Sequence, residues 1–118
     1  MLAGIYHLVR ETTYATGVLY LSKTGAVPEL ALSKGTTYHL FLSHVWSSAQ
    51  DQVAVIKRQL QLCLPGVRVF LDVDDLKDIN ALESYIHQSA VVLIFLSKNY
   101  FCSRNCLREA YATAKKEK

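Results

Sequence analysis

The stretch AVVLIFL, residues 90–96, decides the fold because it is apolar at every position. A strand of this kind is typical of a parallel sheet whose two faces are both covered by helices. We therefore expect residues 90–96 to form a strand that is buried on both faces. The run is far shorter than the roughly 20 apolar residues that a membrane-spanning helix needs, so it predicts no membrane span.

Two further strands are expected before this run. Residues 37–43 (TYHLFLS) and 67–71 (VRVFL) are rich in β-branched and aromatic residues. Between these strands, apolar residues recur at helical spacing, as at Val53, Ile56 and Leu60. The spacing predicts a helix that Ser47 or Ser48 caps and that Pro65 and Gly66 end.

Two shorter helices complete the pattern. One is expected around residues 82–86 with Asn80 as its cap, and the other begins after Ser103 and ends in a lysine-rich segment. Strands that alternate with helices predict an α/β fold with a three-stranded parallel sheet flanked by helices. Ligands of such sheets bind beyond the carboxyl ends of the strands. Here these ends are Ser43 and His44, Asp72, and Ser97.

Length and composition limit the classes of protein that fit. The chain has 118 residues, enough for one domain, which we expect at residues 36–118 after a leader at residues 1–35. The net charge of +3 is too small to indicate nucleic-acid binding. The charge is uneven, because residues 50–97 are acidic and residues 98–118 are basic. Three cysteines form no disulfide framework, which favours a reducing compartment, the cytoplasm.

The acidic residues 72–78 are a candidate metal site that the spacing does not support. In an EF-hand that starts at Asp72, Leu76 and Lys77 fall where an acid or amide and a glycine are needed. Cys102 and Cys106 have no His or further Cys nearby at zinc spacing. We therefore expect no metal, and we interpret residues 72–78 as a solvated connection.

Glu109 is the residue that its position singles out as a candidate ligand contact. It lies one to two turns into the last predicted helix, which starts near the carboxyl ends of the strands. A carboxylate in that position can contact a ligand, although a helical Glu of this kind is also commonly exposed to solvent. His44 is open to the same two interpretations, as a polar site residue or an exposed one.

Three segments together resemble one family. They are YHLFLSHVW (residues 38–46), VRVFLDVDDL (residues 67–76) and SAVVLIFLSKNYFCSRNCLREA (residues 89–110). The first and second resemble the opening strand and the start of the BB loop of Toll/interleukin-1 receptor (TIR) domains. The third resembles the family pattern Ser-x-Asn-Tyr, then Ser-x-Trp-Cys-Leu-x-Glu-Leu. The matching residues are Ser97, Asn99, Tyr100, Ser103, Cys106, Leu107 and Glu109.

The resemblance implies a flavodoxin-like fold and a cytosolic signalling module that associates with other TIR domains or with its own copies. It implies that an interaction loop is formed by Asp74, Asp75, Leu76, Lys77, Asp78, Ile79 and Asn80. Some TIR domains cleave NAD⁺ between nicotinamide and ribose. In that case NAD⁺ is a substrate and no cofactor is needed, Glu109 is the catalytic carboxylate, and Ser43, His44, Asp72 and Ser97 line the pocket.

The sequence departs from the family pattern at several points. Asn105 replaces the tryptophan before the helix cysteine, Ala110 replaces the last leucine, and Asn80 stands where the BB loop usually has a glycine. The resemblance spans residues 37–111, and this sequence ends after the third of the five strands that the family fold normally has. Three readings stay open, namely an interaction module, an NAD⁺-cleaving enzyme, and a remnant that does not fold alone.

Overall fold

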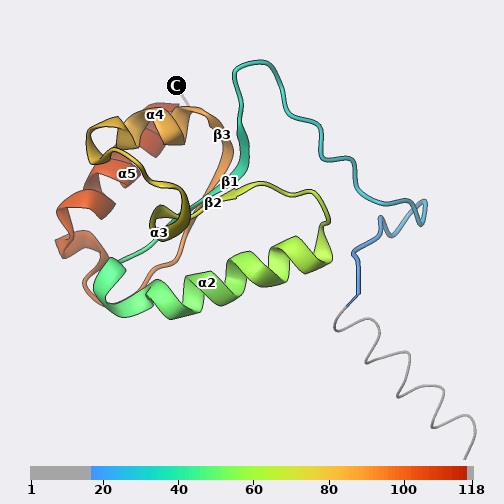
Figure 1. Cartoon of the computed structure of the whole chain (residues 1–118), viewed down its shortest axis with the longest axis horizontal. Helices are drawn as coiled ribbons and strands as arrows, with labels where there is room; N and C mark the ends of the chain where they lie inside the picture. Colours follow the sequence, from blue (N-terminus) through green and yellow to red (C-terminus); the bar gives the residue numbers. More distant parts are fainter. Residues whose placement is uncertain (1–16, 117–118) are drawn as a thin grey trace, which may run out of the picture.

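The computed structural model describes residues 17–116, with residues 73 and 74 described by their backbone alone. Three parallel strands form one sheet in the order β2-β1-β3. The strands are β1 (Tyr38–Ser43), β2 (Val69–Phe70) and β3 (Ser89–Ile94). Helix α2 covers one face of the sheet, and helices α4 and α5 cover the other (Figure 1). The predicted α/β fold with a three-stranded parallel sheet is confirmed.

The helices follow the predicted order, with one short addition in the acidic stretch. Their bounds are α2 (Trp46–Cys63), α3 (Asp72–Asp75), α4 (Leu82–His87) and α5 (Arg104–Lys116), with 3₁₀ turns η1 (Ile79–Ala81) and η2 (Tyr100–Cys102). Adjacent residues of β1 point to opposite faces of the sheet, because side chains alternate along a strand. Phe41 packs with Phe70, Leu82 and Ile86 under α4. Leu42 packs with Val53, Val69 and Leu71 under α2.

The helix caps differ from the predicted ones at two of three places. Helix α2 begins at Trp46, and its N-cap Val45 makes no side-chain hydrogen bond. The helix therefore starts two residues earlier than a cap at Ser47 would set it, and three earlier than a cap at Ser48. Asn80 does not cap α4, whose N-cap is Ala81 and makes no side-chain hydrogen bond. Asp78 caps the preceding turn η1, where its Oδ1 accepts from the backbone N–H of Asn80 at 3.0 Å. The prediction for Ser103 is confirmed, since its Oγ accepts from the N–H of Cys106 at 3.3 Å.

The prediction that residues 90–96 are buried on both faces is wrong. Val91 is 57% exposed and Leu96 is 67% exposed, while Leu93 and Ile94 are also exposed. The physical reason is the strand order, because β3 lies at the edge of the sheet and pairs only with β1 among the described residues. An apolar sequence makes burial favourable, but burial also needs a neighbouring element on each side.

Residues 17–36 precede the sheet as an extended arm (Figure 1). Its start is bound to the end of α2, since the N–H of Leu19 donates to the carbonyl of Cys63 at 2.8 Å. Its later part is held by His39, whose ring accepts from the N–H of Arg68 at Nδ1 and donates from Nε2 to the carbonyl of Leu30, both at 2.8 Å. His39 replaces the acid that the family pattern usually has here, and it performs a structural task. The expected leader at residues 1–35 lies partly outside the described residues.

Candidate functional site

Four of the predicted site residues are buried beneath the carboxyl ends of the strands. Ser43 ends β1, His44 follows it, Asp72 begins α3, and Glu109 lies on α5. Ser43, His44 and Glu109 have no exposed surface, and Asp72 is almost fully buried. The Ser43 hydroxyl donates to Oε2 of Glu109, so the hydroxyl of Tyr100 is the donor in the hydrogen bond that it makes with Ser43. The topology therefore joins residues 66 positions apart in the sequence.

Burial dominates the electrostatics of Glu109. It raises the pKa of this carboxyl from its ordinary value of 4.5 to about 8, with a second contribution from the nearby charge of Asp72. The hydrogen bond from Ser43 and the charge of Arg108 oppose the shift. Oε1 of Glu109 has no hydrogen-bond partner in the described part of the chain. At neutral pH the ligand-free site therefore holds Glu109 largely in its protonated, uncharged form.

Asp72 is held by the indole of Trp46. The Nε1–H of Trp46 donates to Oδ2 of Asp72 at 2.6 Å, while Oδ1 of Asp72 is buried and has no partner among the described residues. Burial raises the pKa of Asp72, and the hydrogen bond from Trp46 opposes the shift. Beside it, His44 donates from Nε2 to Oε1 of Gln50 at 2.8 Å. Both polar groups are thus fixed by the first turns of α2.

The turn after β3 completes the buried cluster. Asn99 has a φ of 69°, in the left-handed region that Asn tolerates better than most residues, and it turns Tyr100 into the interior. Burial, the largest cause, raises the pKa of Tyr100 to about 12, so its hydroxyl stays a donor. The thiol of Cys106 donates to the carbonyl of His44 at 3.3 Å, which ties α5 to the end of β1.

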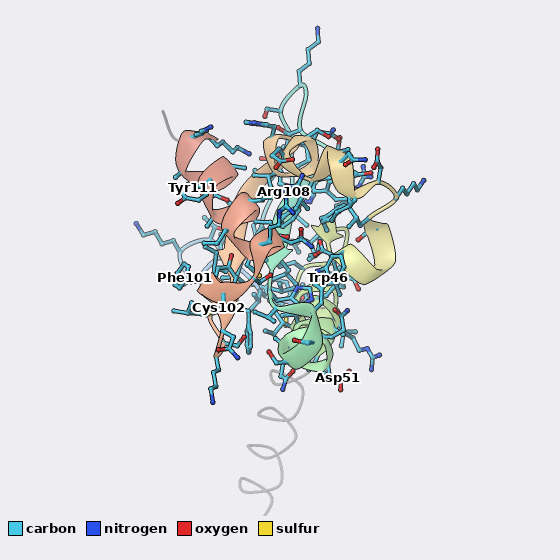
Figure 2. All side chains as sticks on the ribbon, turned by 90° about the vertical axis from the view of Figure 1, so that its left-hand side faces the viewer. Trp46, Asp51, Phe101, Cys102, Arg108 and Tyr111 are labelled. Atoms are coloured by element: carbon cyan, nitrogen blue, oxygen red, sulfur yellow. The ribbon has the colours of Figure 1, made fainter. Side chains whose placement is uncertain are left out.

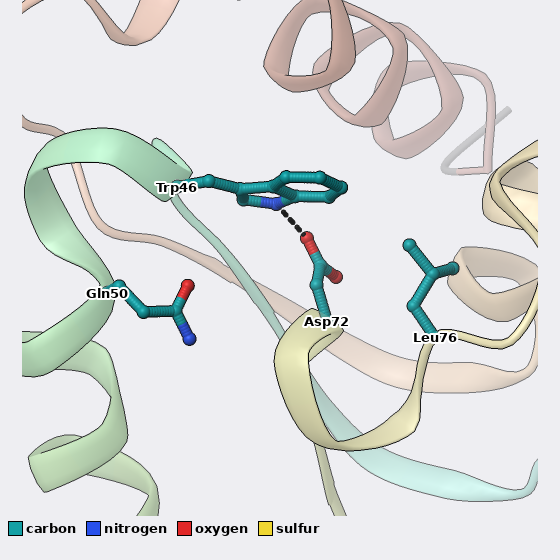
Figure 3. Close-up of a pocket in the computed structure, with 4 residues that line it drawn as sticks. All are labelled: Trp46, Gln50, Asp72 and Leu76. Atoms are coloured by element: carbon teal, nitrogen blue, oxygen red, sulfur yellow. Dashed lines mark hydrogen bonds between the residues drawn. The ribbon is translucent and has the colours of Figure 1, made fainter.

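A cavity of about 350 Å³ opens above the cluster and is lined by Trp46, Gln50, Asp72 and Leu76. Figure 3 shows the indole on one side, Leu76 on the other, and the Asp72 carboxylate between them. Trp46 also borders a second hollow of about 380 Å³, beside η2 and the start of α5. Figure 2 looks at this end of the molecule, where Trp46 and Cys102 are labelled. Asn105, which replaces the family's tryptophan, lines the second hollow.

The remaining predicted site residues are more dispersed. Ser97 contributes a buried Oγ without a partner among the described residues, but it lines neither hollow. Within the expected interaction loop, Lys77, Asp78, Ile79 and Asn80 are exposed. Asp75 instead pairs with Lys57 at 3.1 Å and accepts from the N–H of Leu71. Asn80 needs no left-handed backbone, because Asn99 is the single non-glycine residue with positive φ in the described part of the chain.

Sequence reasoning missed the two residues that shape the cavity. Trp46 ends the segment YHLFLSHVW but was given no site role, and Gln50 belongs to no motif. Both reach the site because α2 begins at Trp46, earlier than the predicted caps placed it. Within residues 17–116, no group of three or more His, Cys, Asp or Glu side chains is arranged to hold a metal ion. No described helix is long and apolar enough to cross a membrane.

The parallel sheet, covered by helices on both faces, defines a flavodoxin-like α/β domain. A buried Ser–Glu pair and an Asp lie at the carboxyl ends of its strands. A family model described as "TIR domain" matches residues 40–118. This match covers more than half of the sequence, and the chain therefore belongs to the TIR domain family. Searches of curated proteins and of solved structures returned no match.

Proposed function

We propose that this TIR domain is a cytoplasmic signalling module that works by associating with other copies of itself and with other TIR domains. The observation that carries this proposal is the exposed apolar surface of β3. Val91, Leu93 and Ile94 are all exposed on one edge strand. Soluble monomers rarely leave such a set of apolar side chains uncovered, and the free edge of a strand is a ready template for pairing.

The occupant we propose for this surface is β3 of a second copy. An edge strand can pair with its own copy about a two-fold axis, since each partner then presents the same groups to the other. The interaction loop offers a second surface, with Ile79 exposed beside Lys77 and Asp78. The acidic middle and the basic end of the chain add a charge asymmetry that can steer association.

Sedimentation velocity over a range of protein concentrations tests this proposal. We expect the wild-type chain to form dimers or larger species, and the Val91→Lys variant to shift that equilibrium toward monomer by at least tenfold, because it buries a charge at the contact. Val55→Lys is the matched control, because Val55 on α2 is 55% exposed and Val91 is 57% exposed. The Ile79→Lys variant tests whether the interaction loop contributes to association independently of β3. A wild-type chain that stays monomeric at high concentration would contradict the proposal.

The second candidate function is hydrolysis of NAD⁺ to nicotinamide and ADP-ribose. The observation that favours it is the carboxyl group of Glu109, which is held by Ser43 close enough to Asp72 to feel its charge. In this reaction the bond between the nicotinamide nitrogen and C1′ of ribose breaks, and its electron pair leaves with nicotinamide. Water then adds to the oxocarbenium-like ribose and loses a proton. An ionised carboxylate stabilises the positive charge that develops on ribose.

The burial of Glu109 sets two requirements for this reaction. Glu109 has no exposed surface, so the side chains above it must move before a substrate can reach it. Its carboxyl must also lose a proton that it holds up to about pH 8 in the ligand-free state. A cationic substrate favours this loss, because a nearby positive charge stabilises the carboxylate.

Chromatographic measurement of nicotinamide release tests the enzymatic function. We expect release by the wild-type chain to increase as the pH rises toward 8, and release by Glu109→Gln to fall at least a hundredfold. Glu83→Gln is the matched control, since Glu83 lies in an exposed ion pair with Arg108 at 2.7 Å. Circular dichroism confirms that each variant is folded. Equal release by the wild type and Glu109→Gln would exclude Glu109 as the catalytic carboxylate.

A further inference from the structure

His39 lies outside the candidate site, and neither proposed function uses it. Its Nδ1 accepts from the backbone N–H of Arg68, and its Nε2 donates to the carbonyl of Leu30, both at 2.8 Å. Arg68 is 29 positions away in the sequence and Leu30 is nine positions away. One side chain on β1 therefore joins the arm, residues 17–36, to the residue that precedes β2.

These two hydrogen bonds require a neutral imidazole ring. A backbone N–H can only donate and a carbonyl can only accept, so one ring nitrogen must accept and the other must donate. A second proton on the ring would turn Nδ1 into a donor that faces the N–H of Arg68. The ring is planar and rigid, so a ring that turns away from Arg68 also leaves its place against Leu30. The charged form of His39 therefore cannot hold both contacts.

The contact with Arg68 matters for β2, which has only two residues, Val69 and Phe70. The carbonyl of Arg68 accepts from the backbone N–H of His39 at 2.9 Å, while the N–H of Arg68 donates to the His39 ring. Both backbone groups of Arg68 are thus bound by one residue. Losing the ring as acceptor leaves the N–H of Arg68 without this partner, which is unfavourable.

The contact with Leu30 matters for the arm (Figure 1). At its start, the N–H of Leu19 donates to the carbonyl of Cys63 at 2.8 Å. In the described part of the chain, the other hydrogen bonds of residues 17–36 stay within the arm, except the one between Leu30 and His39. Leu19, Tyr20 and Val27 are all more than half exposed, so packing adds little there. The His39 ring is therefore a main attachment of the arm to the sheet.

The titratable side chains on the segments around His39 lie mostly at the surface. They are Arg68 before β2, Tyr38 on β1, Glu29 and Lys34 in the arm, and His87 at the end of α4. The guanidinium of Arg68 lies over the ring of Tyr38, 5.5 Å from its centroid. Strand β3, the other neighbour of β1, carries no titratable side chain. Salt screens such exposed charges, whereas a proton on the His39 ring acts directly at the two hydrogen bonds.

We propose that His39 is a pH-sensitive latch, whose neutral ring fastens the arm to the start of β2 and whose protonated ring releases it. Histidine is suited to this task because its charge changes within the range between about pH 5 and 8. The acid that the family pattern usually has at this position could not replace it, since a carboxylate accepts hydrogen bonds but cannot donate one to Leu30. This device is independent of both proposed functions.

Amide hydrogen exchange measured by NMR at pH 7.5 and pH 5.0 tests the latch. Protection is expressed relative to the intrinsic exchange rate at each pH, so that the pH dependence of the exchange chemistry cancels. We expect the protection of the Arg68 N–H to fall at least tenfold at pH 5.0, and that of Phe41, in the fully buried part of β1, to stay the same. Unchanged protection at Arg68, or an equal fall at Phe41, would overturn the proposal.

Three variants assign the effect to its residue. The amide of His39→Gln offers an acceptor and a donor but does not titrate, so the pH dependence at Arg68 should disappear. His39→Ala removes both contacts and should give low protection at either pH. His87→Gln is the matched control, because His87 is exposed, and it should keep the wild-type pH dependence. A pH dependence that survives in His39→Gln, or that vanishes in His87→Gln, would place the titrating group elsewhere and reject the latch.

Discussion

At pH 8 the Glu109→Gln variant is expected to be more stable than the wild-type chain by on the order of 4 kcal/mol, whereas at pH 5 the two should differ by less than about 1 kcal/mol. The cause of this difference is the proton on the carboxyl group of Glu109. In the folded chain Glu109 keeps its proton up to about pH 8, while in the unfolded chain the group loses it near its ordinary pKa of 4.5. Between these values the folded state binds more protons than the unfolded state.

The sign of the pH dependence follows from this difference. The contribution of Glu109 to stability is fully present below about pH 4.5 and is lost as the pH rises to about 8. Glutamine has the same shape and no charge to bury, and its carbonyl oxygen can still accept from Ser43. Replacing Glu109 with glutamine therefore removes the loss of stability at high pH and keeps the hydrogen bond from Ser43. Burial raises the pKa of Asp72 as well, but Asp72 is present in both the wild-type chain and the variant.

Urea unfolding at pH 5, 6, 7 and 8, followed by circular dichroism, measures this effect. Glu83→Gln is the control, because hydrogen bonding to Arg108 lowers the pKa of Glu83 and the group lies at the surface. We expect the control to differ little from wild type at any of these pH values. A difference between Glu109→Gln and wild type that stays constant from pH 5 to pH 8 would mean that Glu109 does not titrate in this window.

The Phe70→Ala variant is expected to lose about 3–5 kcal/mol of stability, which is a large fraction of what a domain of this size possesses. Phe70 has no exposed surface and lies in β2, where its ring stacks on Phe41 at 4.8 Å and on Tyr85 at 4.6 Å between centroids. Removing the ring leaves a cavity between the sheet and α4, and β2 has only two residues with which to hold its place.

The midpoint of urea unfolding gives the size of this loss, and Phe101→Ala provides the matched control. Phe101 contacts Tyr100 edge-to-face, but it is largely exposed, so its removal should reduce stability by less than about 1 kcal/mol. Similar midpoints for the two variants would show that the aromatic stack does not stabilise the sheet. A cooperative transition in the wild-type chain would also reject the reading of this sequence as a remnant that does not fold alone.

The parallel α/β fold and the TIR family could be predicted from local patterns alone. The apolar run at residues 90–96, the aromatic strand before Ser43 and the helical spacing of Val53, Ile56 and Leu60 each indicate their element without reference to the others. Strand order then follows from crossover rules only in part, since placing β3 at an open edge requires knowing what lies beside it. The exposure of β3 could therefore not be predicted from residues 90–96 alone.

Residue types by themselves determined the class of fold, the order of its elements along the chain and the choice of Glu109 as the residue of interest. They placed the ends of β2 and β3 one and two residues later than the structure does. Only the tertiary structure decided that Glu109 is buried against Ser43, that its proton is retained to about pH 8, and that the indole of Trp46 donates to Asp72. Periodicity is a local property of the chain, read within one element. Burial, pKa and the walls of a cavity depend on which elements pack together, and these contacts join residues 26 to 66 positions apart.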